Sequence, residues 1–324
     1  MPKAELPGNP GGSVLYDGKN AVFCTKYLKS VDFPLGERFM MEETIAERMI
    51  FLVIASTGKL IFMIVIGLLA FALPIGYAVW LRKKKGADVL PFFVGCLIFV
   101  VFALVLEPQL HKVALKAPFI VSNIWVYCLY GGLAAGVFEE VGRYVGMRFL
   151  MKKKSRRPVN ALMYGAGHGG IEAMILVGLN LISYAVIAMA FQAGASWPVT
   201  AMGGESNLNL VLQSVMATST SMLPVALLER ILAITLHVSL SVVVYAGVVR
   251  HKVWYLLAAI LGHMVVDSAV LAVNTLTGKI WLSELVCAVL VVVITALAIR
   301  LYKSLKKEAD ATAVPTEAEK PTEA

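Results

Sequence analysis

The chain has little charge and no pairing pattern among its cysteines. Charged residues make up 15% of its 324 residues and hydrophobic residues 59%, with a mean hydropathy of +0.77. Soluble domains carry about 25% charged residues, so this composition excludes an ordinary soluble domain. No Cys-x-x-Cys pair occurs among Cys24, Cys96, Cys128 and Cys287. We therefore expect neither a disulfide framework nor a zinc ribbon.

The chain also lacks the motifs of three classes of membrane-embedded hydrolase. The stretch around Ser196 lies in a predicted loop and breaks the Gly-x-Ser-x-Gly motif of serine enzymes. The Gly-x-Gly-Asp motif of aspartyl enzymes is absent from every apolar segment. The His-Glu-x-x-His motif of one zinc class is missing too, because His168 is followed by Gly169. The sequence therefore excludes these three classes of hydrolase.

Seven apolar segments are long enough to cross a bilayer as helices, which takes about 20 residues each. Backbone groups in lipid must be bonded within the segment, and the alternation expected of strands is absent, so helices are expected. The sequence thus predicts an all-α, polytopic membrane helix bundle. The segments are residues 50–80, 89–107, 119–138 with a helical extension to about 151, 161–191, 219–249, 253–273 and 280–301.

The net charge of +8 comes from clusters between these segments. They follow the first, third, fifth and seventh segments, whereas residues 192–218 contain no Lys or Arg. By the positive-inside rule, we predict a multi-pass protein of the cell membrane with its N-terminus outside and its C-terminus in the cytoplasm. The connection between the second and third segments, which contains Lys112 and Lys116, agrees least well with this orientation. The clusters predict contact with anionic lipids and no nucleic-acid partner.

The two ends of the chain are expected to lie outside a membrane domain over residues 49–301. Residues 302–324 are rich in Glu, Lys, Thr and Pro, which predicts a disordered cytoplasmic tail. Residues 1–48 have no usual signal-peptide core. We interpret them either as a short outer extension or as an over-extended reading frame with a true start near Met49.

Ionisable side chains inside the apolar segments are the most informative feature. Each costs roughly 2.5–3.5 kcal/mol at the bilayer centre, so such residues are rare and usually functional. Four of them lie about 12–18 Å from the cytoplasmic ends of their helices, at 1.5 Å per residue. These four, which therefore share one layer, are Glu139, His168, His237 and His263. Near them in the same segments are Glu140, Arg143, Glu172, Glu229, Arg230 and Asp267.

The spacing of these residues predicts which of them face the same way. His168 with Glu172, and His263 with Asp267, are i,i+4 pairs that share a helix face. Glu139 and Arg143 have the same spacing, which predicts an ion pair between them. Glu229 and Arg230 predict a second internal ion pair.

Histidines and carboxylates at one depth in a dry bundle suit hydrolysis. A carboxylate can take a proton from water, while imidazoles hold that water and stabilise an oxyanion. The same set suits a divalent metal such as zinc, which would lower the pKa of a bound water to about 7. The candidate metal ligands are His168, Glu172, His237, His263 and Asp267. In either case we expect the site to open toward the cytoplasmic half.

Three motifs in order carry a resemblance to a known superfamily. Glu139-Glu140-x-x-Arg143 is followed by Tyr164-x-x-x-His168 and then by His263-x-x-x-Asp267. This pattern resembles the CAAX-protease and bacteriocin-processing (CPBP) superfamily, and most of all its YhfC-like branch of intramembrane metalloproteases. The similarity covers roughly residues 60–301.

The resemblance implies a role for each matching position. Glu139 matches the glutamate that activates water, and His168 a residue that helps to hold that water. His263 matches a residue that lines the oxyanion hole, while Glu140 and Arg143 organise the site. Asp267 stands where prenyl-protein-processing relatives have Asn, and this favours metal ligation at that position.

Structural roles and other functions compete with this interpretation. His237 is as easily a packing residue as a functional one, Glu229–Arg230 is most simply a structural ion pair, and Glu172 is a candidate to orient His168. Buried charges also build the ion paths of transporters and channels, but no inverted repeat is evident. A catalytically silent scaffold is a third option. We predict an intramembrane peptidase whose substrate is a membrane protein or a lipidated peptide.

Overall fold

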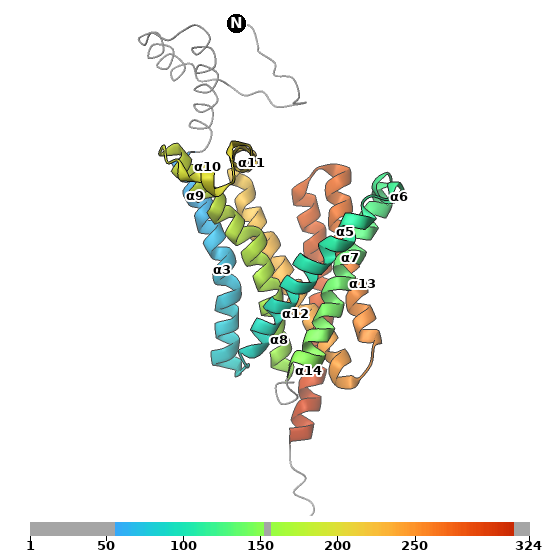
Figure 1. Cartoon of the computed structure of the whole chain (residues 1–324). Helices are drawn as coiled ribbons and strands as arrows, with labels where there is room; N and C mark the ends of the chain where they lie inside the picture. The colour runs from blue at the N-terminus through green and yellow to red at the C-terminus, as the bar shows by residue number, and fades with distance from the viewer. Residues whose placement is uncertain (1–55, 152–156, 314–324) are drawn as a thin grey trace, which may run out of the picture. The chain divides into compact units, whose positions relative to one another are not determined.

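A computed structural model describes residues 56–151 and 157–313 of the chain. These residues form helices and no strand, and seven helical spans are long and apolar enough to cross a membrane. The predicted all-α, polytopic membrane bundle is therefore confirmed (Figure 1). The predicted extension over residues 1–48 and the end of the predicted tail, residues 314–324, lie outside the described residues.

Three of the seven spans combine α-helix with a turn of wider π-helix. The second span consists of α4 (Leu90–Phe99), the π-segment η1 (Val100–Leu106) and α5 (Glu107–Ala114). The third consists of α7 (Ile124–Val145) and η2 (Gly146–Leu150). The fourth consists of α8 (Pro158–Ala173), η4 (Met174–Leu179) and α9 (Asn180–Gln192). Such π-segments often occur at functional sites.

The remaining spans are continuous α-helices apart from one short 3₁₀ turn. They are α3 (Thr57–Lys85), α12 (Leu223–Arg250) preceded by η5 (Thr220–Met222), α13 (Trp254–Thr277) and α14 (Ile280–Ala313). Three short helices lie in the connections, namely α6 (Pro118–Val121), α10 (Trp197–Ala201) and α11 (Glu205–Ala217). α3 is capped by Gly86 and α13 by Gly278, and both glycines are left-handed, with φ of 67° and 63°.

The helix ends differ from the prediction at two spans that matter for the site. The second span continues past Pro108 to Ala114, because a proline at the start of α5 needs no backbone donor there. The third starts at Ile124, where the Asn123 side chain accepts hydrogen bonds from the backbone N–H groups of Trp125 and Val126 at 3.0 and 3.2 Å.

The boundary predicted for the disordered tail is wrong. Residues 302–313 continue α14 as helix, and Leu305 in this part is buried. Glu308 accepts hydrogen bonds from the guanidinium of Arg250 at the end of α12, which attaches this extension to the bundle.

The interior of the bundle is centred on α12. The most apolar stretch of this span is 67% buried, against 33% or less for the other six. α12 packs against α8, α13 and α14, while α7 packs along α13 and α4 along α8. The large apolar side chains of the outer helices are exposed, as expected for a surface that faces lipid.

Glycines allow α4 and α8 to approach backbone to backbone. A Cβ atom at Gly95 would lie 2.3 Å from the carbonyl oxygen of Tyr164, and one at Gly167 would lie 2.0 Å from the carbonyl oxygen of Phe92. Small residues permit such contacts between membrane helices. This contact and the α8–α12 contact hold His168 in the interior.

Candidate metal centre

The structure brings together the four residues that the sequence places in one layer. Glu139 extends from α7, and the histidines come from α8, α12 and α13. The imidazoles of His168 and His237 have centroids 4.9 Å apart, and those of His237 and His263 are 5.3 Å apart. All four side chains are buried. Residues up to 124 positions apart in the chain thus form one polar cluster in an apolar bundle.

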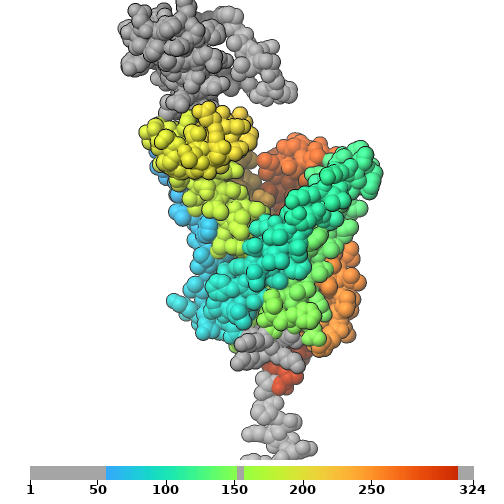
Figure 2. Space-filling view, in the orientation of Figure 1, coloured from blue at the N-terminus to red at the C-terminus, as the bar shows by residue number. Residues whose placement is uncertain are grey.

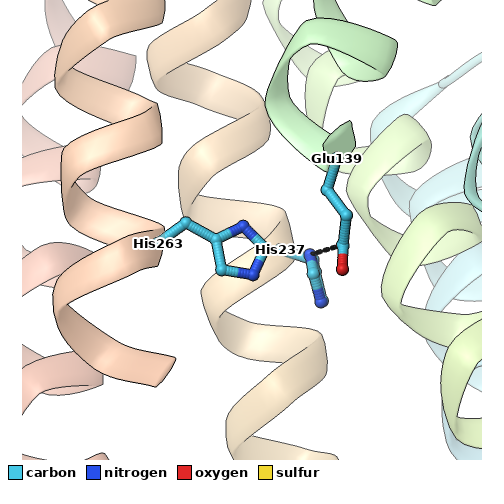
Figure 3. Close-up of side chains that lie close together, drawn as sticks. All are labelled: Glu139, His237 and His263. Carbon is cyan, nitrogen blue, oxygen red and sulfur yellow. Dashed lines mark ion pairs between the residues drawn. The ribbon is translucent and has the colours of Figure 1, made fainter. Parts of the chain in front are cut away.

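Glu139 lies between two of these imidazoles. Its Oε2 atom is 2.9 Å from Nε2 of His168 and 3.8 Å from Nδ1 of His237. Figure 3 shows Glu139, His237 and His263 directed toward one another from three different helices. His168 lies behind Glu139 with its side chain fully buried. It can therefore orient the carboxylate, but it does not line the cavity described below.

Glu140 is fully buried and contacts a different imidazole of the cluster. Its Oε1 atom is 2.8 Å from Nδ1 of His263, and its Oε2 atom accepts a hydrogen bond of 2.9 Å from Nε of Arg143. Since an imidazole nitrogen beside a carboxylate donates to it, Nε2 of His263 is the nitrogen left to act as an acceptor or ligand. This Nε2 lies 3.4 Å from Oδ2 of Asp267.

Arg143 therefore pairs with Glu140 and not with Glu139, so the predicted i,i+4 pair is wrong. Positions i+3 and i+4 share a helix face, and the neighbouring helix decides between them. In this case α12 holds the guanidinium, because Nη1 donates to the carbonyl oxygen of His237 at 2.8 Å and to Oγ of Ser241 at 2.6 Å. Nη2 lies 2.9 Å from Nδ1 of His237.

Glu172 is also placed differently from its predicted role. It faces α12 rather than His168, and its Oε2 atom is 2.6 Å from Nε2 of His237, close but without hydrogen-bond direction. Its Oε1 atom accepts a hydrogen bond of 2.6 Å from Arg230. Arg230 also donates to Glu229 at 2.6 Å, so the predicted Glu229–Arg230 ion pair is present and extends to Glu172.

A cavity of about 500 Å³ begins at this cluster and is lined by α7, α8, α12, α13 and α14. At its inner end lie Glu139, His237 and His263. From there it extends to Asn274 on α13 and Ile280 on α14, at the end of the bundle where these two helices are joined, here called the α13–α14 end. Figure 2 shows the surface indented at this end.

The cavity therefore lies at the end opposite the basic residues, and not at the end that the positive-inside rule assigns to the cytoplasm. The basic clusters at residues 82–85 and at Arg250 lie at the other end of the helices, where α12 is joined to α13. None of the described residues at that end lines the cavity. On the Arg143 side of the cluster lie the guanidinium and the Ser241 hydroxyl, whereas Gly131 and Gly132 of α7 line the cavity on the other side.

Three of these side chains form a donor set of the kind that holds a metal ion. One ligand atom each from Glu139, His237 and His263 lies within 4.8 Å of the others, and all three residues are buried. Two histidines and a glutamate with an open fourth position are a common arrangement for catalytic zinc. Behind them, Glu140 contacts His263 and His168 contacts Glu139, as outer partners that orient metal ligands usually do.

Four further polar side chains in the helices were not identified from the sequence as parts of a site. Glu107 and His111 of α5 and Tyr130 of α7 form a hydrogen-bonded set, in which His111 lies 2.7 Å from the Tyr130 hydroxyl and 3.2 Å from Glu107. Pro108 made this stretch resemble a helix end. Glu284 of α14 is buried and lines the cavity. Its position inside an apolar segment was the signal that could have identified it.

The fold and the site define a polytopic helical membrane protein with a buried glutamate–histidine cluster at the inner end of a cavity. The chain belongs to the YhfC intramembrane metalloprotease family, whose model matches residues 69–292. It is 37% identical over 214 residues to the uncharacterized membrane protein YhfC of Bacillus subtilis strain 168, an alignment that covers 64% of this chain and 82% of that protein. No solved structure matches the chain.

Proposed function

We propose that this protein is an intramembrane metallopeptidase that hydrolyses a peptide bond in a membrane-embedded or membrane-proximal substrate. The observation that carries the proposal is the buried set of Glu139, His237 and His263 at the inner end of a cavity. The description of the family supports it. The order of the three motifs further supports membership of the CPBP superfamily.

Glu139, His237 and His263 are the residues that would hold the metal. A divalent ion such as zinc, held by these residues, would supply a Lewis acid and a bound water of lowered pKa. Cavity-lining carboxylates then remain for proton transfer. We assign to Glu172 the role of accepting a proton from the water. Glu172 lines the cavity, its Oε2 atom lies 2.6 Å from Nε2 of His237, and its Oε1 atom is held by Arg230.

The neighbouring groups position these side chains. Glu140 accepts the Nδ1 proton of His263 and so turns Nε2 toward the cavity. Arg143 offsets the charge of Glu140 and binds the backbone of α12 at His237, which fixes α7 against α12. In a metal-free alternative, Glu139 would itself activate the water, with His168 as its positioning residue.

The basic clusters and the family context support the remaining proposals. Positive charges at residues 82–85 and 152–157 favour a cytoplasmic location of that end, with contact to anionic lipids. The cavity would then open toward the outer side, where it meets a membrane protein or a lipidated peptide as substrate.

The experiment that tests the function combines metal analysis with cleavage. The full chain is purified in detergent, its metal content is measured by mass spectrometry, and cleavage of a peptide library is assayed. Glu139→Gln, His237→Ala and His263→Ala should each lose both the metal and the activity. His251→Asn, a change at an exposed histidine with φ of 54°, is the matched control that should keep both.

Three results would overturn the proposal or part of it. Full cleavage by Glu139→Gln rules out both versions of the mechanism. Activity that survives complete removal of metal, yet is lost in Glu139→Gln, selects the metal-free alternative. Proton flux into liposomes that depends on a substrate, without any cleavage, indicates a transporter instead.

A further inference from the structure

We propose that the part of the cavity nearest the α13–α14 end is a subsite for a positively charged group of the substrate. The group would be the side chain of a Lys or Arg residue, or a free N-terminal amine. This subsite is a substrate preference only if the proposed peptidase function holds. The subsite itself can be detected without any cleavage.

The cavity wall carries an excess of negative charge. It contains one guanidinium, that of Arg230, against five carboxylates. The carboxylates belong to Glu139, Glu172, Glu229, Asp267 and Glu284. A concave site lined by one sign of charge with low-dielectric walls attracts ligands of the opposite sign.

Arg230 already pairs with two of these carboxylates, so the negative charge of the others is not balanced by it. Its Nη1 atom donates to Glu172 and its Nη2 atom to Glu229, each at 2.6 Å. Glu139 pairs with His168 at the inner end. Among the described residues, none forms an ion pair with Glu284.

Glu284 is the observation that points to a ligand. The residue is 8% exposed, it lines the cavity, and its Oε2 atom is buried without a hydrogen-bond partner in the part of the chain that the structure describes. An ionised carboxylate buried without a partner is strongly unfavourable, so such a group either takes up a proton or binds a cation. A cation in the cavity would provide that partner.

The lining favours an organic cation over a second metal ion. Within the described ranges, the one group of three ligands close enough to hold a metal is Glu139, His237 and His263, and it does not include Glu284. The wall beside Glu284 includes the apolar side chains of Val270, Leu271 and Ile280. Such a wall accommodates the methylene stem of a Lys or Arg side chain whose charged end reaches a carboxylate.

Cys287 provides a reporter inside this cavity. It lies one turn after Glu284 on α14 and lines the same wall. In a variant with Cys24, Cys96 and Cys128 replaced by alanine, Cys287 is the single thiol of the chain. Its rate of modification is measured with a trimethylammonium-ethyl and a sulfonatoethyl methanethiosulfonate. Each rate is divided by the rate for a small free thiol in the same buffer.

We expect the cationic reagent to be favoured by about tenfold after this correction, equivalent to about 1.4 kcal/mol. Glu284→Gln, nearly the same shape without the charge, should reduce the preference several-fold. Glu205→Gln on α11 is the matched control, because Glu205 is exposed and does not line the cavity. Equal corrected rates in the parent, or no effect of Glu284→Gln, would overturn the proposal. So would failure of both reagents to reach Cys287.

Peptides then identify the source of the charge. Protection of Cys287 is measured with an acetylated peptide containing one Lys, the same peptide with norleucine instead, and the norleucine peptide with a free N-terminus. The Lys or the free-amine peptide should protect at about tenfold lower concentration than the uncharged peptide. Equal protection by all three would contradict the subsite even if the protein cleaves peptides. Selective protection without cleavage of any peptide would retain the subsite and refute the peptidase.

Discussion

Replacement of Arg143 by methionine should destabilise the protein more than any single change at its surface. The Arg143 side chain is fully buried and makes two hydrogen bonds to Glu140, at 2.9 and 3.1 Å. It also donates to the carbonyl oxygen of His237 and to Ser241. Methionine has a similar length but cannot replace these contacts. The variant would leave the fully buried Glu140 carboxylate with only His263 as its partner.

The expected loss in the free energy of unfolding is about 3–5 kcal/mol, the usual cost of removing one partner of a buried ion pair. Glu140→Gln leaves the buried guanidinium without its carboxylate partner and should cost a similar amount. The double variant removes both charges. It should therefore cost less than the sum of the two, with a coupling of about 0.5–3 kcal/mol.

The assay is unfolding in mixed micelles, followed by tryptophan fluorescence. Arg300→Met is the matched control, because Arg300 is exposed on α14, and it should change the unfolding free energy by less than about 0.5 kcal/mol. A cost for Arg143→Met no larger than that of the control would refute the argument. Additive costs in the double variant would show that the two side chains do not interact in the folded protein.

Three further predictions follow from the contacts of the cluster. His168→Ala should keep the metal but lower the affinity of the protein for it by about 10–100-fold, because His168 contacts the ligand Glu139 and does not line the cavity. His237→Ala should lose the metal. Equal metal affinities of these two variants in a chelator titration would contradict this prediction. Gly167→Ala should lower the free energy of unfolding by about 1–3 kcal/mol, because the new Cβ atom would overlap the Phe92 carbonyl group in the α4–α8 contact. The control Gly76→Ala, where a Cβ atom would have nothing within 4 Å, should leave the stability unchanged or raise it slightly. Glu308→Ala should change the free energy of unfolding no more than the Arg300→Met control does, despite its contacts with Arg250, because an exposed ion pair contributes little. A larger loss would show that the end of α14 is essential to the fold.

The depth of the polar residues was predictable because it depends on one dimension only. An apolar segment must match the bilayer, and each residue adds about 1.5 Å along the helix. Counting along four segments was therefore enough to place Glu139 and three histidines in one layer, and the contacts among them agree. The start of α7 at Ile124 was missed, because a hydrophobicity pattern does not register the Asn123 cap.

The pairing of the charges was not predictable in the same way. Arg143 can reach a residue three or four positions earlier, and the spacing favoured neither. The choice of Glu140 depends on Ser241 and the His237 carbonyl oxygen, which belong to another helix. For the same reason Glu172 faces His237 across the α8–α12 contact, although it shares a helix with His168.

The sequence by itself thus determined that the chain is a seven-span helical membrane protein and which residues lie at the depth of the cluster. Hydrophobic length and the helix rise are local properties of the chain, so no partner helix is needed to infer them. The tertiary structure alone decided that His237 joins Glu139 and His263 as a ligand set while His168 lies behind it. It also decided that the cavity extends to the α13–α14 end. Both depend on how each helix is rotated and where neighbouring helices separate, and these are set by packing between distant segments.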